Sequence, residues 1–153
     1  MKMATYENGE TEVLNGTRFD DAIANGSYRV DVHAAEGDGL VFRYLDGREQ
    51  TVLADGTRRD GRWRAPAAND ATFCQVPYRC LVPQGSRNVL AAGRCVDADE
   101  GAYGALRVMI NCNQLGEVAG TAAWLAMNAN VDAPALDTNA LRRMLAAHGA
   151  LVL

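Results

Sequence analysis

Hydrophobic positions in the first third of the chain change their period after Gly26. Upstream of this glycine they recur at roughly helical spacing, and Asn-Gly pairs, which readily adopt left-handed backbone angles, interrupt them. We therefore predict one short helix from about Arg18 to Ala24, held between turns. Downstream, Tyr28, Val30 and Val32 alternate with polar residues, which is the period of a half-buried strand.

Two further hydrophobic runs have the form of a β-hairpin. LVFRYL and EQTVLA are joined by Asp46-Gly47-Arg48, and an Asp-Gly pair suits a tight turn between alternating strands. A second Asp-Gly turn follows at 55–56. Residues 57–71 are rich in charge and contain Gly and Pro, so we expect an exposed loop or boundary there. Trp63 in this stretch is expected to cover the edge of the core or to stack on a guanidinium.

The hydrophobic density rises after residue 72. Segment 73–83 is predicted to be extended, because its two prolines exclude a continuous helix. NVLAAG, residues 88–93, is a short unbroken apolar run that ends in glycine, which predicts a strand buried on both faces of an α/β sheet. A last helix is predicted from Thr138 to His148, with Asp137 or Thr138 as its N-cap.

The longest helix is predicted from about Leu106 to Asn128. Its apolar side is expected at positions spaced by three and four residues, namely Met109, Cys112, Leu115, Ala119, Ala122, Ala123 and Ala126. Gly116 and Gly120 lie one turn apart and leave one side with almost no side-chain bulk. We expect a sheet or a cofactor to pack closely there, and helix-to-strand packing alone explains the pattern.

Composition and charge narrow the class of protein. The 153 residues, 48% hydrophobic and 22% charged, have the composition of one soluble globular domain. The net charge of -4 and the scattered basic residues give no electrostatic footprint for nucleic acid or an anionic membrane. No stretch approaches the ~20 apolar residues that span a bilayer, and the N-terminus has no apolar signal segment. We therefore expect a cytoplasmic protein without a nucleic-acid or membrane partner.

The four cysteines, Cys74, Cys80, Cys95 and Cys112, are expected to be reduced and buried. A zinc site is the alternative. Zinc sites favour close pairs such as C-x2-C, whereas five, 14 and 16 residues separate these cysteines, so we predict no metal site. Cys80, Cys95 and Cys112 are also candidates for a redox pair, although the sequence has no C-x-x-C motif.

Four motifs in the second half follow one another as in a known family. PYRCLVP is followed by NVLAAGRC, by a loop with small residues and RVM at a helix start, and by a helix that reads G-x-x-A-G-x-A-A. Together with FDDAIANGSYRVDVH upstream, the chain from about Val13 to Leu153 resembles the C-terminal region of FAD-dependent oxidoreductases with a glutathione-reductase-type flavin fold. The resemblance implies an α+β chain that is partly α/β. Residues 1–72 would form a β-rich part of a substrate domain, and residues 73–153 the C-terminal strand-helix part of a Rossmann-like FAD-binding domain.

The resemblance also implies where FAD lies. Residues that match Gly93 and Arg94 lie beside the ribityl and pyrophosphate groups, and those that match Arg107, Val108 and Met109 approach the pyrimidine edge of the flavin. Physical chemistry agrees, because a helix N-terminus presents free N–H groups and the positive end of a dipole to a ligand. The family's G-x-G-x-x-G, which accepts the pyrophosphate, does not occur in this sequence. We therefore expect the chain to supply only one wall of the FAD site.

Three residues are candidates for chemistry on a small-molecule substrate. His33 is able to exchange a proton near neutral pH, Tyr78 to donate a hydrogen bond, and Arg79 to fix a carboxylate or stabilise an oxyanion. Structural roles are the alternative, with His33 hydrogen-bonded beside Asp31 and Arg79 paired with a buried carboxylate. The acidic residues at 97–100 are most simply a solvated loop.

We expect a fragment or truncated homologue of an FAD-dependent oxidoreductase, which in its complete form passes hydride or electrons between a small organic substrate and the flavin. The alternative is a non-catalytic module that has lost the cofactor and persists as a homo-oligomer, in which a symmetry mate covers the exposed half-site. In a third interpretation, a complementing N-terminal FAD-binding chain carries the glycine loop and the two chains assemble.

Overall fold

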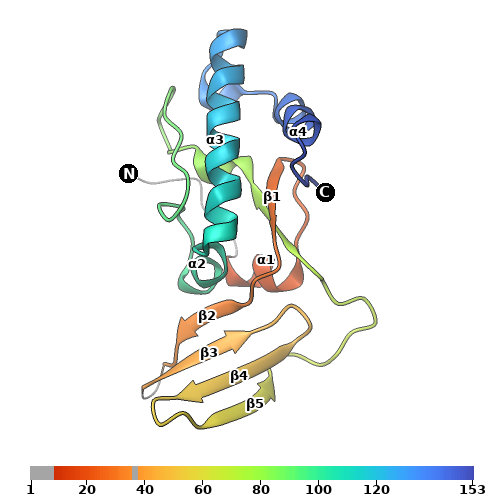
Figure 1. The fold of residues 1–153 in the computed structure, drawn as a ribbon, viewed down its shortest axis with the longest axis vertical. Helices are drawn as coiled ribbons and strands as arrows, with labels where there is room; N and C mark the ends of the chain where they lie inside the picture. Colours follow the sequence, from red (N-terminus) through yellow and green to blue (C-terminus); the bar gives the residue numbers. More distant parts are fainter. Residues whose placement is uncertain (1–8, 36–37) are drawn as a thin grey trace.

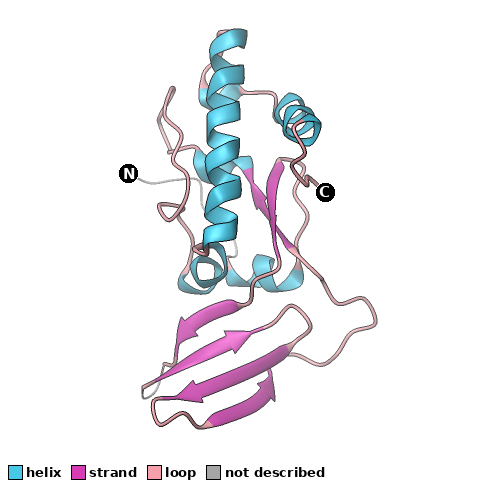
Figure 2. Cartoon of the chain, in the orientation of Figure 1, coloured by secondary structure: helices cyan, strands magenta, loops and turns pink. Residues whose placement is uncertain are grey.

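The helices and strands of the protein occupy different parts of the molecule in the computed structural model, which describes residues 9–35 and 38–153 (Figure 1). A four-stranded sheet forms one end, and most of the helical structure lies beyond it (Figure 2). In chain order the elements are α1 (Glu10–Asn15), β1 (Ala22–Gly26), β2 (Val30–His33), β3 (Gly39–Arg43), β4 (Arg48–Leu53), β5 (Arg58–Arg62), β6 (Cys74–Pro77), η1 (Tyr78–Leu81), α2 (Glu100–Leu106), α3 (Met109–Ala129), η2 (Ala133–Ala135) and α4 (Thr138–Ala147). This mixture of helices with antiparallel sheets confirms the α+β class.

Both sheets are antiparallel. The larger one is a meander in the order β2-β3-β4-β5, and the smaller one pairs β1 with β6. Because Gly26 lies opposite Cys74, the whole larger sheet is inserted between two strands that are hydrogen-bonded to each other. The predicted hairpin of β3 and β4 is confirmed. Gly47, in its turn, has a left-handed φ of 82°, and Gly56, in the turn between β4 and β5, has a φ of 83°.

Two predictions for the N-terminal half are wrong. Residues 22–26 form strand β1, not the helix expected from Arg18 to Ala24, because β6 offers them a backbone ladder and an isolated short helix has little stability. Residues 58–62, expected as a loop, form the edge strand β5. All five of its residues are exposed, so backbone pairing with β4 is what stabilises it. For the same reason its sequence has no alternation of hydrophobic and polar residues from which a strand could be predicted.

The predicted strand at 88–93 is not formed by the described residues. Ala91 donates a backbone bond to Leu81, but a central strand needs a neighbour along its whole length, and the described chain places none beside it. The long helix begins at Met109, not at Leu106. Residues 100–106 form the separate helix α2, and Val108, with ψ at 150°, interrupts the helical path between α2 and α3.

The core lies between α3, α4 and the small sheet. The large side chains that it buries most completely include Leu81, Leu106, Leu115, Val118, Leu141 and Leu145. The last helix is confirmed, and Asp137 caps it through a side-chain bond to Asn139 N–H at 2.9 Å. Trp63 packs against the core and donates its indole N–H to the Tyr44 carbonyl at 2.8 Å, with the Arg64 guanidinium above its ring. No helix in the described chain is long and apolar enough to span a membrane.

Candidate functional site at the start of α3

A hollow of about 540 Å³ lies at the N-terminus of α3. Its lining residues come from β2, from the loop after residue 93, from α2 and from the start of α3: Asp31, Arg94, Tyr103, Arg107, Val108 and Met109. Four of the five predicted cofactor residues therefore line one hollow. Gly93, the fifth, precedes Arg94 in the chain with a left-handed φ of 81°, and it does not itself line the hollow.

Polar contacts hold the walls of this hollow together. The Arg94 Nε donates to the Arg107 carbonyl at 3.2 Å, and the Tyr103 hydroxyl donates to the Arg94 carbonyl at 3.2 Å. Arg107 Nη2 lies 3.5 Å from Asp31 Oδ2, which links the junction between α2 and α3 to strand β2. Asp31 was not predicted as a lining residue. Tyr103 was not predicted as part of the site, because residues 94–105 were expected as a loop.

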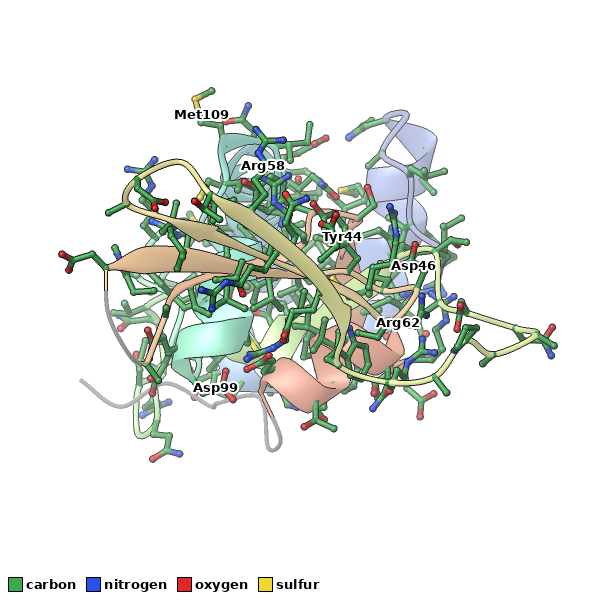
Figure 3. All side chains as sticks on the ribbon, turned by 90° about the horizontal axis from the view of Figure 1, so that it is seen from below. Tyr44, Asp46, Arg58, Arg62, Asp99 and Met109 are labelled. Carbon is green, nitrogen blue, oxygen red and sulfur yellow. The ribbon has the colours of Figure 1, made fainter. Side chains whose placement is uncertain are left out.

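The N-terminus of α3 is open. Its N-cap, Val108, has no side chain able to accept a bond from the first-turn N–H groups. Met109 is 76% exposed and Ile110 is 64% exposed, and Figure 3 shows the Met109 side chain projecting away from the ribbon. The free amide groups and the positive helix end therefore remain available to an electron-rich ligand.

One side of α3 is also uncovered along its length, and we name it the open seam. It comprises exposed positions spaced alternately by four and three residues, namely Met109, Asn113, Gly116, Gly120, Ala123 and Met127. A Cβ added at Gly116 or Gly120 would have no atom within 4 Å, so the close packing expected there is not provided by the described residues. Trp124, beside the seam, is 56% exposed.

Comparison with known families decides the class of this protein. A family model described as FAD dependent oxidoreductase matches residues 3–145. The chain belongs to this family. No curated protein and no solved structure matches the chain.

The residues around the hollow of this family member are chemically compatible with one side of a flavin. The hollow joins Arg94 and the Asp31-paired Arg107 to an uncapped helix N-terminus, whose free N–H groups attract the electron-rich edge of a cofactor. The fit concerns the start of α3, because residues 88–93, predicted as the strand before the cofactor, are not a strand in the described chain.

Tyr78 and Arg79 lie in a different hollow of about 360 Å³, which shares no lining residue with the first. Tyr78 is 4% exposed and donates its hydroxyl to the Ala133 carbonyl at 2.9 Å, and burial raises the pKa of its phenol to about 12. Arg79 pairs with Asp21 at 2.5 Å. The ion pair with Asp21 agrees with the structural alternative for Arg79, and the catalytic roles of Tyr78 and Arg79 stay predictions.

His33 is exposed at the end of β2, opposite Leu40 of β3. Residues two apart on a strand point to the same side of a sheet, so His33 shares a side with Asp31, which lines the hollow at α3. The three predicted catalytic residues therefore do not form one cluster: His33 belongs to the strand that reaches the α3 hollow, and the other two lie elsewhere.

All four cysteines are free thiols. Cys74 and Cys80 are buried as expected, and burial raises the pKa of these thiols to about 11 and about 12. The expectation of burial is wrong for Cys95, which is exposed, and Cys112 is half-buried. Among the described residues, no group of three His, Cys, Asp or Glu side chains is close enough to hold a metal ion.

Asp99 has a structural role that the sequence analysis missed. Its carboxylate accepts a bond from Ala102 N–H at 2.8 Å as the N-cap of α2, and a second bond from Glu10 N–H at 2.9 Å at the first residue of α1. The expectation of a plain solvated loop at 97–100 is therefore wrong at this residue. A signal was present, because aspartate is a preferred N-cap residue and a helix follows it.

Proposed function

We propose that this chain forms one wall of the FAD site of an FAD-dependent oxidoreductase acting on a small organic substrate, and that a polypeptide part with a G-x-G-x-x-G strand completes the site. The observation that carries the proposal is the uncapped N-terminus of α3, which opens into the hollow lined by Arg94, Arg107, Val108 and Met109. FAD, when bound, supplies the hydride or electron transfer.

The residues of the hollow would have distinct tasks. Arg107, Val108 and Met109 would lie at the pyrimidine edge of the flavin, where the first-turn amides of α3 would donate hydrogen bonds to its electron-rich atoms. Arg94 and Gly93 would lie beside the ribityl and pyrophosphate groups. His33 is the substrate-side candidate closest in sequence to a lining residue, and we retain it as the proton carrier.

The open seam supports the completing part of this proposal. Of the 21 residues of α3 only Glu117 is charged, and a helix with so few charges on its exposed side is normally covered. The two seam glycines let a sheet approach the helix closely. A Rossmann-like domain would result if the completing part placed parallel strands against α3 and beside residues 88–93, which would then gain the neighbour that a strand needs.

The test is flavin retention. We expect the chain alone to elute from gel filtration nearly colourless, and to retain flavin absorbance when it is co-expressed with a polypeptide that carries the G-x-G-x-x-G strand, such as one encoded by an adjacent reading frame. In that complex Arg107→Ala should weaken flavin binding by about tenfold or more, as loss of a charge-assisted contact does. Arg59→Ala, on the exposed edge strand β5, is the matched control. Absence of flavin from every combination would refute the proposal.

A non-catalytic oligomeric module is the second candidate, and the open seam favours it as well. In this case two copies would cover each other's α3 without flavin. Sedimentation would then show a stable dimer of the colourless chain, and Gly120→Arg, which places a charged side chain on the seam, would convert it to a monomer. A monomeric, colourless chain that gains flavin on co-expression excludes this candidate.

A further inference from the structure

The guanidinium of Arg29 rests on three aromatic rings. Its Cζ lies 4.2 Å from the centroid of Phe42, 5.1 Å from that of Tyr28 and 5.9 Å from that of Tyr44. We name these rings the aromatic platform. Contact with ring faces uses the flat face of a guanidinium, so an acceptor would be bound through the in-plane N–H groups of its two terminal nitrogens.

Arg29 has no anionic partner in the described chain. No carboxylate of the described residues lies within 4 Å of its nitrogens, and no described acceptor forms a hydrogen bond with them. Its Nε is buried without a partner, whereas its two terminal nitrogens are not among the buried unpaired atoms. A neighbouring cation, Arg107, differs in this respect, because Asp31 compensates its charge.

The platform is continuous with the hollow at α3. The Tyr28 hydroxyl donates to Asp31 Oδ2 at 3.5 Å, and the same oxygen lies 3.5 Å from Arg107 Nη2. Asp31 is also the register partner of Phe42, whose ring lies under Arg29. A short series of contacts therefore joins Arg29 to the place where we put the edge of the flavin.

We propose that Arg29 on its aromatic platform binds the carboxylate of the substrate, so that the enzyme acts on small carboxylic acids with an apolar or aromatic body. That the bound carboxylate is the substrate rests on the proposed function, but carboxylate binding by Arg29 does not itself require flavin. Arg29 supplies one positive charge without a described carboxylate partner, and a carboxylate matches the planar edge of a single guanidinium. The platform provides apolar contact for the rest of the molecule.

The probe is benzoate, with neutral benzamide and inorganic phosphate as comparison ligands, titrated into the ¹⁵N-labelled chain without flavin. We expect benzoate to shift the amide signals of residues 28–31 and 42–44, and to bind more tightly than either comparison ligand. Arg29→Gln should weaken benzoate binding by about tenfold or more, and Arg29→Lys, which keeps the charge but loses the planar fork, by a smaller factor. Arg59→Gln removes the same charge from the other side of the same sheet and should change nothing.

Three results would overturn the inference: benzamide binding as tightly as benzoate, phosphate binding more tightly, or Arg29→Gln leaving benzoate affinity unchanged in a chain whose spectrum remains dispersed. If Arg29→Gln does not fold, the comparison of Arg29→Lys with Arg59→Gln decides. The outcome of the flavin experiment is independent of the outcome of the benzoate titration. Benzoate binding without flavin in any co-expressed complex would refute the FAD site alone, and flavin retention without benzoate binding would refute the Arg29 site alone.

Discussion

Gly104 shows how closely α2 packs on strand β2. A Cβ added at this position would lie 2.4 Å from the Asp31 carbonyl oxygen, which belongs to the backbone and cannot turn aside. Neither neighbour can relax without moving a whole element, and both elements contribute to the hollow at α3, Asp31 from β2 and Tyr103 from α2. A single absent methyl group thus sets the separation of two walls of the candidate site.

Gly104→Ala is therefore expected to destabilise the chain by about 1–3 kcal/mol, as overpacking of a core does. Gly116→Ala is the control, since it is also a helical glycine but a Cβ there meets nothing within 4 Å. That change should raise the free energy of unfolding by up to ~1 kcal/mol through helix propensity. Urea denaturation measures both, and substitutions that shift stability in the same direction would contradict this account of Gly104.

At the scale of elements, the feature that bears on function is the N-terminus of α3, which has no side-chain cap. Val108→Ser introduces a hydroxyl that is able to accept a bond from a first-turn N–H group, so we expect the chain to gain about 1 kcal/mol of stability. In the flavin-binding complex the same hydroxyl competes with the cofactor for those N–H groups, and flavin affinity should fall. Thermal unfolding of the free chain and flavin titration of the complex report the two effects. Greater stability without any loss of flavin affinity would show that the amides do not face the cofactor.

How much of each element the sequence predicts depends on where its stabilisation comes from. The β3–β4 hairpin and α4 were predictable because their signals are local: Asp46 and Gly47 in the turn, and Asp137 at the cap. Strand β1 was not, because its partner β6 lies 48 residues further along the chain at the Gly26–Cys74 pair. The candidate site was predicted for Arg94 and for residues 107–109 through family motifs. Asp31 was not predicted as a site residue, because its contact with Arg107 joins two distant parts of the sequence and leaves no local signal.

At the scale of the whole molecule, buried thiols make stability depend on pH. The pKa of Cys80 rises from its usual 9.0 to about 12, and that of Cys74 to about 11. Between the usual thiol pKa of 9.0 and the raised pKa of each cysteine, the unfolded chain loses thiol protons that the native chain keeps, so the free energy of unfolding falls as pH rises. We expect the free energy of unfolding to be unaffected by these thiols below about pH 9 and to decline above it. Urea denaturation in reducing buffer from about pH 8 to about pH 11 measures the decline, which Cys80→Ala should make shallower and Cys95→Ala should not.

Asp99 accepts hydrogen bonds from the backbone N–H groups of Ala102, which is close to it in the sequence, and of Glu10, which lies 89 residues before it. During synthesis the first helix therefore emerges long before the carboxylate that secures its leading end has been translated. Native contacts of such sequence separation form late in folding, because a long loop must close before they form, so α1 gains its bond to Asp99 only after the residues around Asp99 are in place. The N-terminal end of α1 is thus held by a residue from a distant part of the chain, whereas α4 is capped by Asp137, the residue directly before it.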